Sequence, residues 1–138
     1  MRWNFFVVDH DPAATQRAAA AIEKIHPDAN IQQLASGADA LAAVDTSTHA
    51  PSLVLYDFDV PDLDAISFLG ELRQRRWPSP IPVAVLSSSD SEKKMMTCYR
   101  LGARAFLRKP VDLRELRETV RDFAQPATRA GDQRRSVA

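Results

Sequence analysis

Two short runs of apolar residues in this chain are not interrupted by polar ones. "FFVV" covers residues 5–8 and "LVLY" covers residues 53–56. A strand with one face in water alternates apolar and polar side chains, so an uninterrupted run indicates a strand that is covered on both faces. Such strands belong to parallel sheets with helices on both sides. The two runs, within strands predicted at 3–8 and 52–57, therefore favour an α/β fold.

Three further strands and five helices are predicted around these runs. The strands are "NIQQLA" at 30–35, "VAVLS" at 83–87 and "RAFLR" at 104–108. Strands and helices that alternate in this way predict a five-stranded, doubly wound parallel sheet with five strand–helix units. Each helix begins at a residue whose short polar side chain suits an N-cap. These caps are Asp11, Ser36, Asp64, Asp90-Ser91 and Asp112.

Proline, glycine and the helical repeat indicate where the helices end and which way they face. His26-Pro27 ends the first helix, the third runs from Asp64 to Arg76, and the fourth ends at Gly102. Asp112 and Glu115 have the spacing of a capping box. Inward-facing positions are expected to be Ala14, Ala18, Ala21, Ile22 and Ile25; Ala38, Leu41 and Ala42; Ala65, Phe68, Leu69 and Leu72; and Leu113, Leu116, Val120 and Phe123.

Length and composition restrict the class of protein. The 138 residues suit one domain, expected over 1–125, followed by a flexible tail at 126–138 that lacks apolar periodicity. Basic and acidic residues balance at 18 each, so no excess of positive charge favours nucleic acid. The single cysteine, Cys98, permits no internal disulfide, and no apolar run is long enough for a leader or a membrane span. A cytoplasmic protein is expected.

Polar residues that suit one chemistry follow four of the predicted strands. The carboxyl ends of parallel strands meet at one edge of a doubly wound sheet, so these side chains are expected to converge. Each alone has an ordinary explanation as a turn residue or a helix cap, but four strand ends together predict a functional site. The residues are Asp9, His10 and Asp11 after the first strand, Asp57 and Asp59 at the third, Ser87 at the fourth, and Lys109 after the fifth.

These groups complement one another in phosphoryl transfer. A carboxylate can attack phosphorus and form an aspartyl phosphate. Clustered carboxylates such as Asp9 and Asp57 repel each other unless a cation compensates them, and Mg²⁺ prefers oxygen ligands. A bound cation and Lys109 would neutralise the transferring oxygens, and the Ser87 hydroxyl would bind one of them. The sequence therefore predicts a phosphoryl-transfer site that uses Mg²⁺.

Four segments resemble the receiver domains of response regulators in two-component signalling, over residues 4–124. "VVDHDP" is similar to the acidic first loop of that family, and "LVLYDFDVPDLDA" to its phosphoacceptor strand and loop. "VAVLSSS" is similar to its hydroxyl strand, and "GARAFLRKPVDLREL" to its lysine loop and last helix. The phrase "CYRLGARAFLRKP" is typical of small stand-alone receivers, such as those of chemotaxis. The resemblance implies the flavodoxin-like receiver fold.

The resemblance also implies a phosphoacceptor and its metal ligands. Asp57 would accept a phosphoryl group from a sensor histidine kinase or a phosphotransfer protein. Asp9 and its neighbour would hold Mg²⁺ with Asp57 and the main-chain carbonyl of Asp59. That neighbour is His10, where the family usually has a second acid. Since imidazole is a poor ligand for Mg²⁺ and a good one for Mn²⁺, we expect weak Mg²⁺ binding, slow phosphorylation, and Mn²⁺ as an alternative cation.

The response to phosphorylation is implied by the same resemblance. Lys109 would pair with the phosphoryl group, Ser87 would move to bind it, and Phe106 would turn inward as the switch aromatic. The signal would pass to a downstream protein by docking, or to a second copy in a homodimer. The resemblance implies no enzymatic activity, and we expect no direct contact with nucleic acid or membrane.

Two alternatives remain open. "DFDV" at 57–60 also fits haloacid-dehalogenase-type phosphatases, in which the first Asp is the nucleophile and the second an acid/base. Against this, no acidic metal-binding loop follows Lys109, two crossovers precede Asp57, and Pro61 matches the receiver loop. The other alternative is a receiver-like binding module that works without phosphorylation. It rests on His10 and on Ala65, which stands where the receiver loop usually has glycine.

Overall fold

The computed structural model describes residues 3–77 and 79–127. Within that range five strands and five helices alternate, as the sequence predicts. The strands form one parallel sheet in the order β2-β1-β3-β4-β5, so the predicted fold class is confirmed. The elements are β1 (Asn4–Val8), α1 (Pro12–Ile25), β2 (Asn30–Leu34), α2 (Gly37–Thr46), β3 (Leu53–Asp57), α3 (Ala65–Leu72), β4 (Val83–Ser87), α4 (Glu92–Arg100), β5 (Ala105–Arg108) and α5 (Leu113–Phe123).

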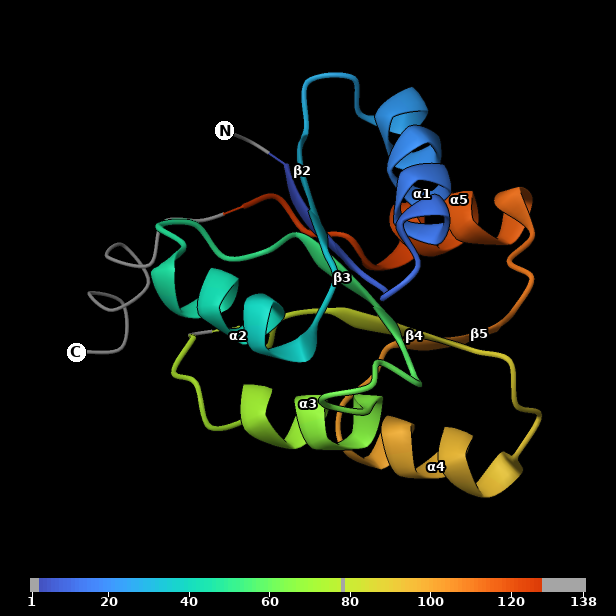
Figure 1. The fold of residues 1–138 in the computed structure, drawn as a ribbon. Coiled ribbons are helices and arrows are strands. Elements are labelled where there is room, and N and C mark those ends of the chain that lie inside the picture. Colours follow the sequence, from blue (N-terminus) through green and yellow to red (C-terminus); the bar gives the residue numbers. More distant parts are fainter. Residues whose placement is uncertain (1–2, 78, 128–138) are drawn as a thin grey trace.

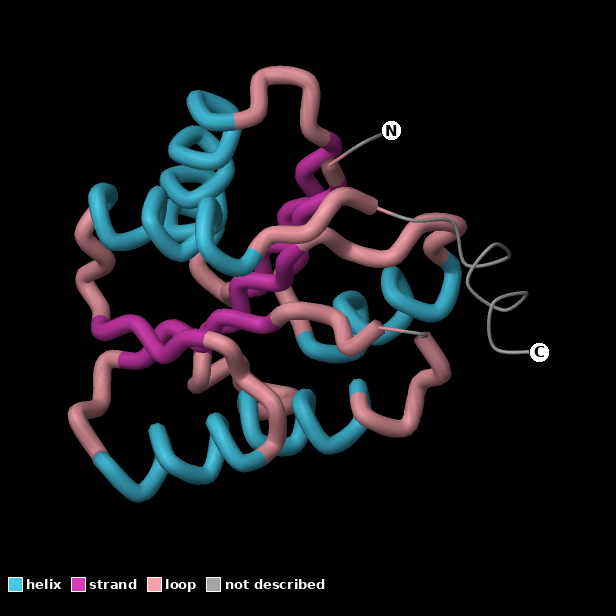
Figure 2. The backbone as a smooth tube through the Cα atoms, turned by 180° about the vertical axis from the view of Figure 1, so that it is seen from behind, coloured by secondary structure: helices cyan, strands magenta, loops and turns pink. Residues whose placement is uncertain are grey.

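Helices cover both faces of the sheet. α1 and α5 lie on one face and α2, α3 and α4 on the other (Figure 1), and the view from behind shows the same two layers (Figure 2). Every residue of β1 and β3 is buried, which explains their uninterrupted apolar runs. Alternate residues serve opposite faces, so that Phe5 and Val7 join the core under α1 and α5 while Phe6 and Val8 join the core under α2, α3 and α4.

The third helix is shorter than predicted. It ends at Leu72 and not at Arg76. The backbone N–H groups of Gln74 and Arg75 bond to the carbonyls of Glu71 and Leu72 in tighter turns. Leu72 is the last buried side chain of the helix, and the polar residues after it offer no apolar surface that packing could use to support another turn.

The predicted inward faces are confirmed in α3 and only partly elsewhere. All four predicted positions of α3 are buried, as are Ala21 and Ile22 in α1. In α2 the prediction is wrong for Ala38 and Ala42, which are exposed, whereas Leu41 packs partly against the core. The buried residues of α2 are Gly37, Ala40 and Val44. The α2 segment is apolar at most positions, so its composition does not single out one face.

The first turn of α5 also differs from the prediction. Leu116 and Val120 are buried, but Leu113 is 56% exposed, because it lies in the first turn of the helix beside an open groove. Asp112 caps the helix by accepting a hydrogen bond from the N–H of Arg114. The reciprocal bond of a capping box, from Asp112 to the Glu115 side chain, is absent among the hydrogen bonds of the described residues.

The predicted domain boundary at Gln125 lies within the described residues. The N–H of Gln125 bonds to the carbonyl of Ser52 at 3.0 Å, and of the predicted tail, residues 128–138 lie outside the described range. In the described part of the chain, no helix combines the length and the apolar character that crossing a membrane requires.

Candidate functional site

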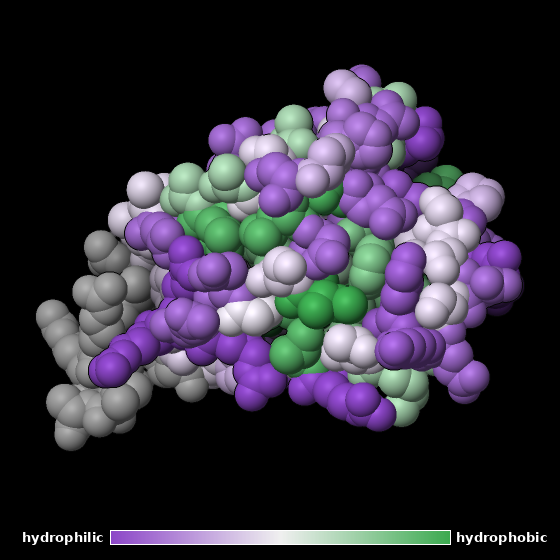
Figure 3. All heavy atoms as spheres, turned by 60° about the horizontal axis from the view of Figure 1, so that its bottom comes forward, coloured by the Kyte–Doolittle hydropathy of each residue, from purple (hydrophilic) through white to green (hydrophobic). Residues whose placement is uncertain are grey.

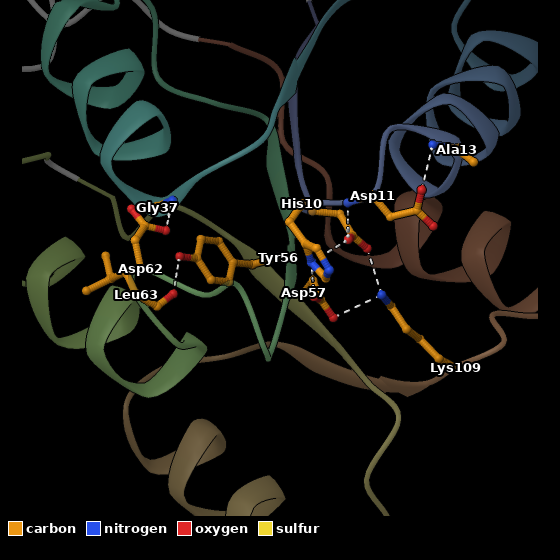
Figure 4. Close-up of polar contacts among 10 residues, drawn as sticks. His10, Asp11, Ala13, Gly37, Tyr56, Asp57, Asp62, Leu63 and Lys109 are labelled. Carbon is orange, nitrogen blue, oxygen red and sulfur yellow. Dashed lines mark hydrogen bonds and ion pairs between the residues drawn. The ribbon is translucent and has the colours of Figure 1, made fainter.

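The candidate site lies where the winding of the sheet reverses. From β1 the chain crosses to β2 on one side, and from β3 it crosses to β4 on the other, so β1 and β3 flank the switch point. Asp9 directly follows β1 and Asp57 is the last residue of β3. Ligands of doubly wound sheets bind in the crevice at this point. Lys109, which follows β5, reaches into it toward both acids (Figure 4).

Lys109 connects the two carboxylates. Its Nζ lies 2.6 Å from Oδ2 of Asp9 and 2.9 Å from Oδ1 of Asp57. The two acidic side chains are only 7% and 5% exposed. Buried carboxylates this close repel each other, and the ammonium group between them offsets that repulsion. One lysine compensates one of the two negative charges, so the site can accommodate a further cation.

Burial sets the charge balance of the site. It raises the pKa of Asp57 above its usual value, the hydrogen bond from Lys109 acts in the opposite direction, and the charge of Asp9 adds to the rise. Burial also acts on Lys109, where it lowers the pKa, but the hydrogen bonds to Asp9 and Asp57 outweigh it and leave that pKa raised. Lys109 is therefore a permanent cation near neutral pH, beside an unusually basic carboxylate.

His10 completes a cluster of three metal-ligating side chains. Its Nδ1 lies 3.5 Å from Oδ1 of Asp9 and 3.8 Å from Oδ2 of Asp57, and the three ligand atoms all lie within 4.8 Å of one another. The His10 side chain is 58% exposed, which leaves room for water ligands. The two buried carboxylates fit a divalent cation, and the imidazole nitrogen suits Mn²⁺ better than Mg²⁺.

The other acids of these loops lie outside the cluster. Asp11 caps α1, with Oδ1 accepting from the N–H of Ala13 at 3.0 Å, as expected for a helix cap. Its own N–H donates to Oδ1 of Asp9 at 3.0 Å, which orients that carboxylate (Figure 4). Asp59 is exposed and its carboxylate is not part of the cluster. The predicted role of its main-chain carbonyl stays a prediction.

Ser87 and Phe106 lie on neighbouring strands next to the site. Ser87 is fully buried at the end of β4, and its Oγ accepts from the N–H of Ser89 at 3.0 Å. Its carbonyl accepts from the N–H of Lys109 at 2.8 Å, which joins it to the lysine loop. Phe106 is partly buried against the core under α2, α3 and α4. Their predicted movement on phosphorylation remains a prediction.

A contact that the sequence does not predict fixes the loop after Asp57. The carboxylate of Asp62 accepts from the N–H groups of Gly37 and Ala38 at 2.8 and 2.9 Å, at the start of α2 (Figure 4). These two bonds lower the pKa of Asp62. The negative charge also suits the positive end of the helix dipole. The loop behind the candidate phosphoacceptor is thereby attached to a different helix.

The close approach of this loop to α2 explains why position 37 is a glycine. A Cβ on Gly37 would lie 2.5 Å from Cβ of Leu63 and 2.7 Å from the hydroxyl oxygen of Tyr56. The Tyr56 hydroxyl donates to the carbonyl of Leu63 at 2.6 Å, so neither neighbour is free to move away. In the sequence, a glycine directly after the cap Ser36 is the one signal of this close approach.

A groove opens beside the site between α1 and α5. It encloses about 820 Å³, and Asp9, Asp57 and Lys109 line one end of it. Alanines of α1 and leucines of α5 form much of its wall. A partner that fills this groove would reach Asp57 from the α1 side. Basic side chains along it are those of Arg17, Lys24 and Arg117.

The response regulator receiver domain is the family whose model matches the chain, over residues 5–121. Protein PilH of Pseudomonas aeruginosa is 30% identical over 114 residues, which cover 83% of this chain and 91% of PilH. Response regulator Rre1 of Synechocystis is 30% identical over 121 residues, 87% of this chain and 51% of Rre1. KdpE of Escherichia coli, a KDP operon transcriptional regulatory protein, is 36% identical over 78 residues, 56% of this chain and 33% of KdpE. The aligned part of this chain thus spans about half of Rre1 and a third of KdpE.

Solved structures agree on the fold. The CheY-like receiver domain protein of Methanospirillum hungatei superimposes with a TM-score of 0.78 at 19% identity, covering 99% of each chain. The chemotaxis response regulator CheY4 of Vibrio cholerae gives a TM-score of 0.77 at 19% identity, covering 88% of this chain and 98% of CheY4. The family match favours the receiver over the phosphatase alternative.

Proposed function

This chain belongs to the response regulator receiver family, and from that premise we propose that Asp57 accepts a phosphoryl group from a histidine kinase or a phosphotransfer protein. The observation that carries the proposal is the position of Lys109 between the carboxylates of Asp9 and Asp57. Lys109 and Asp9 are 100 positions apart in the sequence, so the fold itself creates this contact. A lysine held between two buried acids at the switch point, together with a bound divalent cation, would supply the positive charge that a phosphoryl group needs there.

In the proposed transfer, an oxygen of Asp57 attacks the phosphorus of the donor's phosphohistidine. The new O–P bond forms as the N–P bond breaks, and the histidine nitrogen leaves with the electron pair. Lys109 exchanges its hydrogen bond with Asp57 for one with a phosphoryl oxygen. The Ser87 hydroxyl accepts from Ser89 and keeps its own hydrogen, so it remains able to donate to a second phosphoryl oxygen.

A divalent cation, when bound, supplies positive charge to the transferring oxygens. Asp9 and Asp57 would hold it with their carboxylates and Asp59 with its main-chain carbonyl, while His10 contributes an imidazole nitrogen. Mg²⁺ is the proposed cofactor by family, with Mn²⁺ as the alternative that the His10 donor favours. Both cations belong in any test of phosphorylation.

The proposed partners use two different surfaces. The phosphodonor would approach through the groove between α1 and α5, since that groove ends at Asp57. A downstream protein or a second copy would dock on α4, β5 and α5. On the face formed by α3 and α4, apolar side chains gather among hydrophilic ones (Figure 3), and Met96 and Tyr99 of α4 are 44% and 42% exposed. Neither surface is proposed to bind nucleic acid or membrane.

We propose that the chain acts in the cytoplasm as a phosphoacceptor and not as an enzyme. A protein-glutamate methylesterase of Cereibacter sphaeroides is 32% identical over 113 residues, but these cover only 29% of that protein. The activity in its name is therefore not extended to this chain. The phosphorylation-independent binding module remains the second candidate, because His10 replaces a usual metal-binding acid.

Phosphorylation by a small donor tests the function. The protein is incubated with acetyl phosphate or phosphoramidate and either Mg²⁺ or Mn²⁺, and followed on phosphate-affinity gels and by mass spectrometry. We expect one phosphoryl group, removed by hydroxylamine as an acyl phosphate is, and absent from Asp57→Asn. Asp59→Asn is the matched control and should keep the phosphoryl group. Phosphate retained in Asp57→Asn would exclude Asp57, and no incorporation with either cation would favour the binding module.

A further inference from the structure

A second cavity lies at the end of the sheet opposite Asp57. It encloses about 480 Å³ and is lined by Val83, the first residue of β4, whereas Asp57 is the last residue of β3. The ends of α3 and α4, together with Trp77 and residues 79–81, line it. Its volume is within the range of small-molecule sites, roughly 300–1,000 Å³. We refer to it as the arginine pocket, after Arg73, Arg75 and Arg100, which line it.

The floor of the arginine pocket is apolar. Leu69, Leu72, Ile81 and Leu101 line it, and the first three are buried in the core under α2, α3 and α4. The indole of Trp77 also lines the pocket and packs partly against that core. A tryptophan face beside an apolar floor is a surface on which a planar ring stacks favourably.

One of the three arginines is already paired. Nε of Arg75 lies 3.0 Å from Oδ1 of Asp45, and Nη1 lies 3.0 Å from Oε2 of Glu71. These bonds fix the Arg75 side chain, which is 24% exposed, as part of the wall. Its charge is largely compensated by the two acids, so it offers little to a ligand.

The other two arginines, Arg73 and Arg100, are exposed and line the pocket. Within residues 3–77 and 79–127, neither Arg73 nor Arg100 has an acidic side chain within ion-pair distance. Each follows or ends a helix, α3 or α4, and a cation there complements the helix dipole. The dipoles explain one basic residue at each helix end, but not why both border one cavity with an indole. Since the whole chain has equal numbers of basic and acidic residues, the two also do not reflect a basic composition.

We propose that the arginine pocket binds a small planar aromatic anion, with its ring against Trp77 and its acid group on Arg73 and Arg100. Guanidinium groups bind carboxylates and phosphates through paired hydrogen bonds. The pocket borders the C-terminal ends of α3 and α4, so arginine side chains, and not N-terminal helix amides, would hold the acid group. Nucleoside monophosphates and aromatic carboxylates share this chemistry. The proposal does not depend on phosphorylation of Asp57.

Fluorescence of Trp77 is the direct test. The chain has two tryptophans, so Trp3→Phe leaves Trp77 as the only indole. This protein is titrated with AMP and with benzoate, and with adenosine and benzamide as their uncharged counterparts. We expect at least one anion to quench the fluorescence of Trp77 with an affinity roughly tenfold higher than that of its uncharged counterpart. Binding of AMP alone would identify a phosphate site, and binding of benzoate alone would identify a carboxylate site. Binding of both would show that the pocket recognises the chemistry they share.

Arginine variants separate the proposed contacts from general charge. Arg73→Gln and Arg100→Gln should each weaken binding of the anion roughly tenfold, with the thermal midpoint used to verify folding. Arg121→Gln is the matched control, because Arg121 lies in the last turn of α5 but not in the pocket, and it should leave binding unchanged. Equal binding of anions and uncharged counterparts, no binding of either anion, or an equal loss in Arg121→Gln would overturn the proposal.

Discussion

A buried carboxylate destabilises the folded state unless its partners compensate it fully, and Asp57 is not fully compensated. Burial raises its pKa in the folded protein, so ionised Asp57 costs stability at pH values above that raised pKa, and the cost disappears as pH falls below the unfolded value. Asp57→Asn should therefore raise the free energy of unfolding by roughly 1 kcal/mol at neutral pH. Urea unfolding without divalent cations measures this.

Removing the charge of Lys109, the partner of Asp57, should change the free energy of unfolding in the opposite direction. Lys109→Met leaves Asp9 and Asp57 buried without their cation, and should lower the free energy of unfolding by roughly 3 kcal/mol.

The difference in the free energy of unfolding between wild type and Asp57→Asn should shrink in acid, where the carboxylate of Asp57 is protonated in both the folded and the unfolded state. Equal stability of wild type and Asp57→Asn at pH 7 would mean that Lys109 compensates Asp57 completely.

We predict that His10 determines which cation the site prefers. His10→Asp replaces a nitrogen donor with an oxygen donor and adds a negative charge, so we expect Mg²⁺ to bind at least tenfold more tightly and to raise the thermal midpoint. Wild type should respond more to Mn²⁺ than to Mg²⁺. Thermal midpoints at increasing cation concentration measure both, with Asp59→Asn as a control that should behave like wild type. Equal Mg²⁺ affinity in wild type and His10→Asp would make the histidine a neutral replacement.

For single residues, the sequence predicts which side chains belong to the candidate site better than it predicts their contacts with other loops. Asp57 ends a strand and Asp9 and Lys109 follow strands. The carboxyl ends of these strands must share an edge, so the topology alone brings the three side chains together. The bond from Gly37 to Asp62 depends on how the loop after β3 lies against α2. No spacing rule connects those two positions, which is why the contact is absent from the prediction.

Among the elements, two glycines in helices give opposite expectations. Gly37→Ala forces a Cβ to within 2.5 Å of Leu63, and should lower the free energy of unfolding by roughly 1–3 kcal/mol. Gly70→Ala, in α3, meets no atom within 4 Å, and should raise it by roughly 0.5–1 kcal/mol because alanine favours helix. Urea unfolding of both variants tests the pair. Stabilisation by Gly37→Ala would show that α2 shifts away from the loop at little cost.

α4 is the helix most weakly attached to the core. The structure describes all of it, and it buries one side chain, Cys98. Burial raises the pKa of that thiol to about 11, so the native thiol should react slowly with a disulfide reagent. We expect its labelling to occur through local opening of α4, with a rate that depends weakly on urea below the unfolding transition. A labelling rate of Cys98 that depends on urea as strongly as global unfolding does would contradict this.

Helix faces were harder to predict than helix positions, for a physical reason. In α3 the apolar residues occupy one stripe, and Ala65, Phe68, Leu69 and Leu72 are all buried as predicted. The α2 segment carries small apolar residues on more than one side, so its inward face is set by contacts with the sheet. Leu113 is on the correct stripe of α5, but it lies at the groove, where no neighbouring element covers it.

For the whole molecule, the sheet separates two cores that meet only through the strands. Val85 and Phe106 contribute to the core under α2, α3 and α4, while Leu86 and Leu107 contribute to the core under α1 and α5. A change at Ser87 and Phe106 therefore acts first on the α4 side of the sheet. Under the proposed function, this arrangement would link Asp57 to the α4 face of the molecule and leave the groove between α1 and α5 to the proposed donor.

Amide hydrogen exchange with and without a phosphoryl mimic such as beryllofluoride tests whether phosphorylation acts on the α4 side of the sheet. We expect exchange to change in α4, β5 and the start of α5, and to change little in α1 and α2, because α4 is weakly attached and begins four residues after Ser88. Ser87→Ala should still bind the mimic at Asp57 but lose the change in α4, since the hydroxyl that connects the phosphoryl group to β4 is gone. Asp57→Asn with the same reagents should show neither effect. Changes confined to α1 would place the response on the donor side and contradict the proposed output surface.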